Sequence, residues 1–298
     1  MSFVEEEIAT QPALWQRAAG LASECVDVLP ARGERVVFLG CGTSLYVAQA
    51  VAAAREAAGH GESDAFPASE MPLGRRYDLA VALSRSGTTS EVLEVVAQMD
   101  GSTPVLAVTA DGANPLAQGA ARTVVMEFAD EQSVVQTRFA TCTVALFRAL
   151  LGDSLETASA DAQRALAEPP PVDADGVRQL VFLGRGSTVG LAHEAALKVR
   201  EAAQAWSEAY PAMEYRHGPI SVAEPGTVVW ALSPLPSGLA DEIRATGASL
   251  VAPSGDPLAE LVGAQRFAVA LAQARGLDPD RPRNLTRSVV LDGRSGSG

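Results

Sequence analysis

Short apolar runs alternate with longer amphipathic stretches along the chain, after about 30 N-terminal residues in which apolar side chains recur at helical spacing. Apolar runs that end in glycine or small polar residues are typical of buried strands, and the stretches behind them are typical of helices. The pattern predicts, in order, a strand running into a glycine-rich turn (35–44), a helix (46–59), a short strand (64–67), a strand, turn and helix (77–99), a strand (103–111), a helix (114–121), a strand (122–128) and a long helix (133–152). This alternation is typical of an α/β fold with a parallel sheet.

The second half of the chain repeats the pattern. A stretch rich in proline and aspartate, 165–177, is the best candidate for a linker. Residues 179–195 then resemble residues 35–50, and strands near 227–233 and 249–252 and a helix over 257–275 follow. We therefore predict two similar α/β lobes that arose by duplication. The predicted lobes cover residues 1–168, including the leading helix, and 169–298, including a flexible tail at 293–298.

Composition narrows the classes of function. Apolar residues make up 47% of the chain, enough for a sizeable core, and no apolar run reaches the ~18–20 residues of a membrane helix. A net charge of −13 disfavours nucleic acid as a partner, although a local basic pocket still suits one phosphate. The acidic N-terminus is unlike a targeting peptide, and three cysteines without paired or metal-like spacing indicate a reduced, cytoplasmic protein. The three histidines lack metal-ligand spacing, so we expect no metal site.

Two glycine- or hydroxyl-rich turns follow predicted strands of the first lobe. The glycines of GCGTS (40–44) let the backbone approach an anion at a helix N-terminus. A plain tight turn is the alternative. The sequence fits a dinucleotide-binding fingerprint poorly. LSRSGTTSE (83–91) is the stronger signal, because it crowds an arginine and the hydroxyls of Ser84, Ser86, Thr88 and Thr89 around Gly87, where a helix cap needs one hydroxyl. We expect it to bind a phosphate. Its counterpart in the second lobe, ALSPLPSG (231–238), has two prolines where N–H donors are needed.

Lysine usage singles out one helix. Of 23 basic side chains 22 are arginine, and Lys198 is the only lysine. Glu194, Lys198 and Glu201 are spaced i, i+4 and i+7, on one helix face. A surface salt bridge is the ordinary interpretation, but small and apolar neighbours predict a largely buried helix. A buried carboxylate with a raised pKa is a usable general base, and Glu201 suits that role.

His217 is the third candidate for chemistry. It lies in a predicted loop, between Tyr210-Pro211 and Gly218-Pro219, whose turn residues fix the backbone around it. A hydrogen-bonded structural histidine is the alternative. We favour a catalytic role.

These motifs together resemble the sugar isomerase (SIS) family, and most of all the isomerase half of the glucosamine-6-phosphate synthases. The resemblance is carried by FLGCGTS, LSRSGTTSE, the stretch 194–221 and DPDRPRNLTRSVVL, and it extends over about 35–291. It implies two SIS lobes, each a five-stranded, flavodoxin-like parallel sheet flanked by helices, in a homodimer. It implies no cofactor. Without a glutaminase domain, glutamine-dependent synthesis is not expected.

The resemblance also implies roles for individual residues. Glu201 would move the proton at C2 of a ring-opened sugar phosphate, Glu194 and Lys198 would support it, and His217 of the partner subunit would open the ring. The binding residues fall into two groups, namely Ser84, Arg85, Ser86 and Thr89 for the 6-phosphate and Thr43, Ser44, Val134 and Gln136 for the sugar.

Two positions depart from the synthase pattern. The synthases have glutamine at the place of Arg85 and lysine at the place of Arg287. Arginine stays protonated and forms no imine, so Arg287 is expected to pair with a substrate oxygen.

Several reactions stay open at this point. Removal of the C2 proton leads to isomerisation, to deamination when the 2-amino group is free, or to loss of the 3-substituent when the amine is acetylated. We favour an isomerase or deaminase of an amino-sugar 6-phosphate. A lyase on N-acetylglucosamine 6-phosphate, an enzyme of another phosphosugar such as a fructosamine 6-phosphate, and a non-catalytic phosphosugar sensor are the alternatives.

Overall fold

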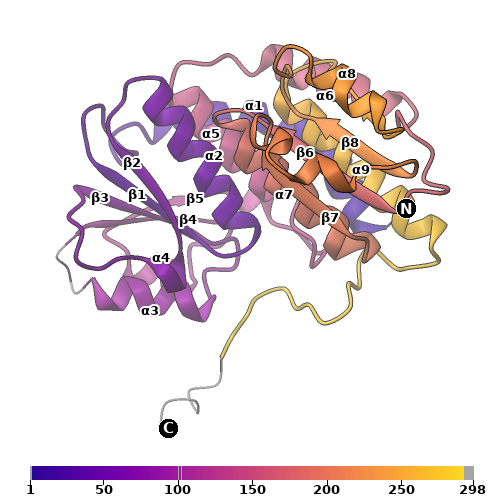
Figure 1. Cartoon of the computed structure of the whole chain (residues 1–298). Coiled ribbons are helices and arrows are strands. Elements are labelled where there is room, and N and C mark those ends of the chain that lie inside the picture. Colours follow the sequence, from indigo (N-terminus) through magenta and orange to yellow (C-terminus); the bar gives the residue numbers. More distant parts are fainter. Residues whose placement is uncertain (1, 100, 102, 292–298) are drawn as a thin grey trace, which may run out of the picture.

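Two parallel sheets, each flanked by helices, form the framework of the protein in a computed structural model that describes residues 2–99, 101 and 103–291 (Figure 1). The first sheet has the order β2-β1-β3-β4-β5 and the second the order β7-β6-β8-β9, with every strand pair parallel. All residues of β1, β3 and β4 are buried. Such continuous apolar strands are expected when helices cover both faces of a parallel sheet.

The first lobe follows the predicted order of elements. Its strands are β1 (Val36–Gly40), β2 (Ser63–Pro67), β3 (Leu79–Leu83), β4 (Val105–Thr109) and β5 (Arg122–Val125). Its helices are α1 (Phe3–Glu24), α2 (Thr43–Ala57), α3 (Ser90–Gln98), α4 (Pro115–Gly119) and α5 (Arg138–Leu150), with short 3₁₀ turns η1 (Ala68–Glu70) and η2 (Glu127–Ala129). The α5 helix starts later than predicted because residues 130–137 form an irregular loop before it.

The second lobe contains elements that the sequence pattern did not reveal. Its strands are β6 (Gln179–Gly184), β7 (Ser207–Pro211), β8 (Thr227–Ala231) and β9 (Ser249–Val251). Its helical elements are α6 (Glu156–Ala167), α7 (Thr188–Ala203), η3 (Glu214–Arg216), η4 (Pro219–Val222), α8 (Leu239–Ala245) and α9 (Pro257–Ala274). The elements α6, β7 and α8 are the unpredicted ones. The strand β7 is short and half-exposed, so it lacks the apolar run that marks a central strand.

The expectation of five strands in each lobe was wrong for the second lobe, whose sheet has four strands within the described residues. The reason is chain length. In the first lobe residues 110–137 separate β4 from α5 and include β5, whereas only residues 252–256 separate β9 from α9. No chain is left there for a fifth strand.

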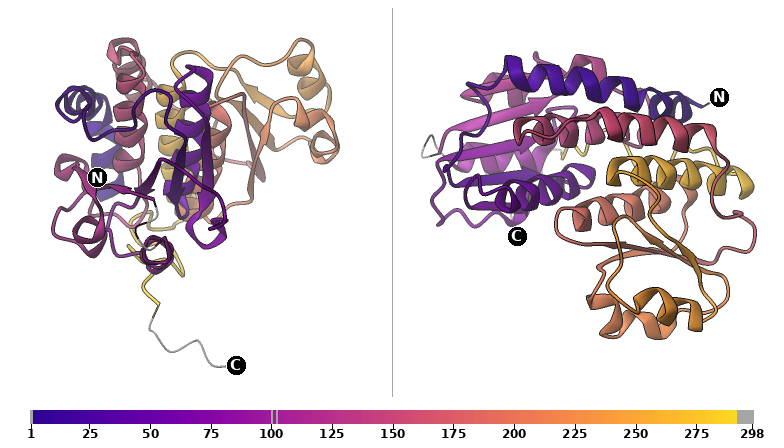
Figure 2. Two further views of the ribbon diagram at one scale, coloured as in Figure 1. Left: turned by 90° about the vertical axis from the view of Figure 1, so that its left-hand side faces the viewer. Right: turned by 90° about the horizontal axis from the view of Figure 1, so that it is seen from above.

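Helices hold the two lobes together. The long helix α1 lies along α5 and also contacts α6 and α9 (Figure 2). Helix α6, which ends just before the predicted boundary at residue 168, packs mainly on α9 and α1. The division into 1–168 and 169–298 remains a prediction, and the tail at 293–298 lies outside the described residues.

Helices α2 and α7, one from each lobe, cross in close contact. A Cβ atom placed on Gly190 of α7 would lie 2.5 Å from the carbonyl oxygen of Tyr46 and 2.6 Å from the amide nitrogen of Ala50, both in α2. Glycine is therefore required at residue 190 for this packing. The contact brings the N-terminus of α2 over the middle of α7.

The described residues contain neither a membrane-spanning helix nor a metal-binding cluster. No helix among them is both long and apolar enough to cross a bilayer. No group of three or more histidine, cysteine, aspartate or glutamate side chains in the same part of the chain is arranged to hold a metal ion.

Gly190→Ala is expected to lower the free energy of unfolding by about 1–3 kcal/mol, because the new methyl group meets backbone atoms that cannot move independently. Urea unfolding followed by circular dichroism measures this change. Gly20→Ala in α1 is the matched control. Its Cβ meets nothing within 4 Å, so we expect roughly 0.5–1 kcal/mol of stabilisation. Equal effects of the two substitutions would contradict the packing argument.

Candidate active site

A buried lysine joins the two lobes. Lys198 of α7 is only 1% exposed, and its Nζ lies 2.5 Å from Oε2 of Glu201 and 3.4 Å from Oε1 of Glu194. The ammonium group also donates to Oγ1 of Thr43 at 2.8 Å, at the start of α2. The helical spacing predicted this face of α7, and the contact with Thr43 from the other lobe completes the shell of acceptors around the charge.

The two glutamates of this cluster differ in exposure. Glu194 is fully buried, whereas the side chain of Glu201 is 18% exposed. Burial raises the pKa of the Glu194 carboxyl to about 7, and the charge of Lys198 only partly opposes this effect. Burial alone would lower the pKa of Lys198, but the charges of Glu194 and Glu201 outweigh it and leave the pKa raised. The sequence argument expected a buried carboxylate at Glu201; complete burial is found at Glu194 instead, and Glu201 is the carboxylate that solvent reaches.

The hydroxyl-rich loop leads from β3 into α3, and its neighbour at the same sheet edge is the glycine-rich turn. Since β1 and β3 are adjacent and parallel, the turn with Thr43 and Ser44 and the loop over 84–89 both lie at the carboxyl ends of the strands. Ligands of open α/β sheets bind outside this edge. The sheet topology therefore places the predicted sugar and phosphate residues on one side of the first lobe.

Loop geometry fits an anion site. Gly87 has φ +63°, and a Cβ there would overlap the side chain of Asn114, so only glycine is accommodated. Oγ of Ser84 accepts the Gly87 amide at 3.1 Å, while Ser86 and Thr88 donate to neighbouring hydroxyls. Thr89 precedes α3, and its side chain makes no capping hydrogen bond.

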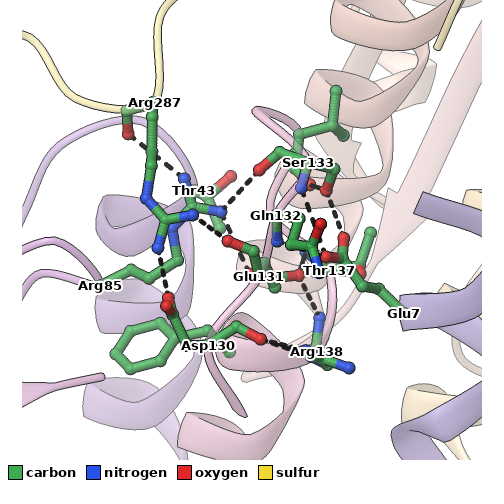
Figure 3. Close-up of polar contacts among 12 residues, drawn as sticks. Glu7, Thr43, Arg85, Asp130, Glu131, Gln132, Ser133, Thr137, Arg138 and Arg287 are labelled. Carbon is green, nitrogen blue, oxygen red and sulfur yellow. Dashed lines mark hydrogen bonds and ion pairs between the residues drawn. The ribbon is translucent and has the colours of Figure 1, made fainter. Parts of the chain in front are cut away.

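Arg85 does not face these hydroxyls. Its guanidinium is buried, lies 3.3 Å from Oε2 of the equally buried Glu131, and donates to the carbonyl oxygens of Ser133 and Arg287 (Figure 3). A buried arginine paired in this way is fixed by its partners. Arg85 therefore connects the hydroxyl-rich loop, the loop before α5 and the C-terminal segment, and its guanidinium is turned away from the loop hydroxyls.

The loop before α5 is held by two buried carboxylates. Oε1 of Glu131 accepts from the amides of Thr137 and Arg138 at 2.5 and 2.8 Å and thereby caps α5. Glu7 of α1 accepts from the amide of Gln132 at 2.5 Å and from the hydroxyl of Ser133 (Figure 3), and burial raises the pKa of Glu7.

The predicted sugar residues Val134 and Gln136 lie between these anchors, and both are half-buried. Oε1 of Gln136 is buried and has no hydrogen-bond partner among the residues that the structure describes. An unsatisfied buried oxygen of this kind is expected where a ligand supplies the missing donor.

Arg287 and His217 lie apart from the lysine cluster. Arg287 pairs with Asp130 at 2.5 Å and donates to the carbonyl oxygen of Glu131. His217 is exposed at the end of η3, and within the described residues its imidazole contacts neither Glu201 nor Lys198. One chain therefore assembles the lysine cluster and the hydroxyl-rich loop but leaves His217 outside them.

Four residues of the site region escaped the sequence argument, namely Glu7, Asp130, Glu131 and Ser288. Glu131 follows the predicted strand 122–128 and could have been suspected as the partner of a buried arginine. Glu7 gives no such signal, because its partners are 125 and 126 positions away.

The first lobe matches the SIS domain family over residues 31–151. A glutamine–fructose-6-phosphate aminotransferase (isomerizing) of Aeropyrum pernix is 32% identical over an aligned stretch that covers 72% of this chain and 43% of that protein. For the Methanothermobacter thermautotrophicus enzyme of that name the identity is 26%, covering 97% of this chain and 56% of the relative. This chain is a SIS domain protein. It spans about half the length of these curated relatives, and the match confirms the resemblance to their isomerase part.

Solved SIS structures match both lobes. Glucosamine-6-phosphate deaminase from Thermotoga maritima has a TM-score of 0.80 and 27% identity, over 97% of this chain and 100% of that one. The C-terminal domain of glucosamine-fructose-6-phosphate aminotransferase from Francisella tularensis has the same TM-score at 20% identity, over 95% and 98%, which shows a shared fold. The fold of this chain therefore matches these solved structures over nearly its whole length.

The raised pKa of Glu194 predicts a pH-dependent stability. The pKa of Glu194 is about 7 in the folded state, above the ordinary value of 4.5. Between pH 4.5 and 7 the folded state therefore keeps a proton that the unfolded state has lost. This group therefore makes the free energy of unfolding fall as pH rises from 4.5 to 7. Relative to Glu194→Gln, the wild type should lose on the order of 3 kcal/mol across that window. Urea unfolding at several pH values measures it.

The control for this experiment is Glu156→Gln, which alters an exposed glutamate at the start of α6. Its profile should run parallel to that of the wild type. If the Glu194→Gln profile is also parallel, Glu194 does not titrate as described.

Proposed function

We propose that this protein is a sugar-phosphate isomerase of the SIS type that acts on an amino-sugar 6-phosphate and releases ammonia, as a deaminase of the glucosamine-6-phosphate kind. The observation that carries the proposal is the cluster of Lys198 with Glu194 and Glu201, buried between the lobes and completed by Thr43 beside the sugar-binding turn. A phosphate sensor needs the hydroxyl loop but has no use for a buried ammonium with two carboxylates. The 27% identity to a glucosamine-6-phosphate deaminase, over 97% of this chain and 100% of that one, adds support.

Binding is proposed to use the edge of the first sheet. The hydroxyls of Ser84, Ser86 and Thr89 would hold the 6-phosphate, since several hydroxyl donors at the start of a helix accommodate a dianion without a neutralising lysine. Arg85 would support the loop from behind. Thr43, Ser44, Val134 and Gln136 would line the sugar, with the unpartnered Oε1 of Gln136 accepting from a sugar hydroxyl.

Proton transfer is assigned to Glu201. It is the exposed carboxylate of the cluster, and an acid–base group must reach its substrate. Glu201 would take the C2 proton of the open aldehyde, giving an enolamine, and C1 would then be reprotonated to give an imine at C2. Water adds to the imine carbon and ammonia leaves, so that glucosamine 6-phosphate and water give fructose 6-phosphate and ammonia.

The remaining groups would position Glu201 and the substrate. Lys198, 2.5 Å from the Glu201 carboxylate, would fix its position, and Glu194 would balance the buried ammonium charge. Arg287, bonded to Asp130, is not placed to form an imine or to shuttle a proton. His217 would open the sugar ring from the partner subunit of a homodimer, and we place the protein, with its free cysteines, in the cytoplasm.

Glu201→Gln is expected to keep binding of glucosamine 6-phosphate but to lower kcat by about 10²–10⁴-fold, because the amide cannot accept the C2 proton. The readouts are NMR of the sugar in deuterated water, which follows exchange at C2, and an ammonia assay. Glu208→Gln, on the neighbouring strand β7, is the control and should keep full activity.

The wild-type reaction separates the remaining functions. Ammonia and fructose 6-phosphate from the free amine support the deaminase. A ketose without ammonia shows an isomerase, and an unsaturated product from N-acetylglucosamine 6-phosphate shows a lyase. Tight binding without turnover or C2 exchange would mean that the protein is a sensor.

Mixing two inactive variants tests the role of His217. If the histidine acts across the dimer, Glu201→Gln and His217→Ala subunits combined in equal amounts should form heterodimers with one intact site, restoring roughly a quarter of wild-type activity. The two variants are unfolded and refolded together, and each refolded alone is the control. Absence of any recovery would place His217 in the same chain as its Glu201, or outside the site.

A further inference from the structure

The C-terminal segment lies across the hydroxyl loop, although about 200 residues separate them in the sequence. Oγ of Ser288 accepts from Ser86 at 3.1 Å and from Thr88 at 2.9 Å. Backbone bonds reinforce this contact, because the Ser90 amide donates to the Val289 carbonyl at 3.1 Å and the Leu291 amide to the Ser90 hydroxyl at 2.8 Å. The segment is therefore attached to the loop that is proposed to hold phosphate.

Two arginines fix the segment just before Ser288. Arg85 donates to the carbonyl oxygen of Arg287 at 3.2 Å, and the Arg287 guanidinium lies 2.5 Å from Oδ1 of Asp130 and donates to the carbonyl oxygen of Glu131 (Figure 3). The Asp130 carbonyl is itself bonded to Arg138 at the start of α5. Asp130 thus links the loop before α5 to the C-terminal segment through the ion pair of its side chain with Arg287.

The hydroxyls of Ser86, Thr88 and Ser288, which bond to one another, can also donate to a phosphate. Each carries one proton that rotates about its C–O bond, and phosphate oxygens accept several such protons at once. No cation is needed beside them for a single phosphate. Ser288 is within hydrogen-bond distance of both loop hydroxyls, so its hydroxyl can donate to the same anion.

We propose that Asp130, acting through Arg287, is a positioning residue that holds Ser288 as a hydroxyl of the phosphate site. The inference rests on the proposed sugar-phosphate function and deepens it, because it assigns part of substrate affinity to the C-terminal segment. Phosphate recognition is then shared by two distant parts of the chain.

Asp130→Asn is the first test. The side chains of Asp130 and Arg287 are 47% and 41% exposed, so their bond is of moderate strength. We expect the KM for glucosamine 6-phosphate and the Kd for inorganic phosphate to rise about three- to tenfold, with kcat within about twofold. Ser288→Ala should act in the same direction. Arg281→Ala is the matched control, since Arg281 is 89% exposed and contacts only Asp278 within the described residues.

The charge swap Asp130→Arg with Arg287→Asp excludes a general structural effect. It should recover most of the affinity that either single substitution loses, while the binding of unphosphorylated glucosamine stays unchanged throughout. Isothermal titration with inorganic phosphate gives the affinities without any turnover.

The outcomes distinguish the two proposals. A wild type that converts glucosamine 6-phosphate while Asp130→Asn keeps full affinity overturns the role of Asp130. A wild type that binds phosphate without turnover, and loses affinity in Asp130→Asn, retains that role and removes the proposed reaction. A wild type that binds no phosphate overturns both.

Discussion

One buried ammonium group is the interaction on which the arrangement of the lobes depends. Removing a charge from water costs several kcal/mol, and the cost is offset only when the surrounding groups are complete. For Lys198 two acceptors come from its own helix and one, Thr43, from the other lobe. Thr43 reaches the lysine because α2 and α7 cross at Gly190 with backbone in contact with backbone. The lobes therefore cannot separate without leaving a charge partly unpaired.

The two glutamates beside this ammonium group have different surroundings and therefore different proposed roles. Glu194 is enclosed and its pKa is raised to about 7, whereas the carboxylate of Glu201 is partly open to the solvent. Both are about one helical turn from Lys198 on a single helix, so their difference does not come from local sequence. It comes from what each side chain meets across the interface, which is α2 for Glu194 and open space for part of Glu201.

Local patterns were enough to predict the α/β alternation and the helix face of Lys198, because strand burial and helical spacing are properties of contiguous residues. They were not enough to place Arg85. Its neighbours in the loop are hydroxyls, which made a phosphate contact the natural expectation, but its charge is satisfied by Glu131, 46 positions further on. The strand β7 escaped for a similar reason, since an edge strand with half-exposed side chains is defined by its pairing with β6. The missing fifth strand of the second lobe reflects an absence of chain, which a repeat pattern does not reveal.

The bias against lysine has a practical consequence. Since Lys198 is the only lysine, the protein has a single ε-amino group, and it lies at the junction of the lobes. Incorporation of isotopically labelled lysine would thus give one side-chain resonance, and that resonance would report on the interface alone. In a chain with several lysines this signal would overlap with those of the other lysines. The composition of the protein supplies a spectroscopic probe at its centre without any substitution.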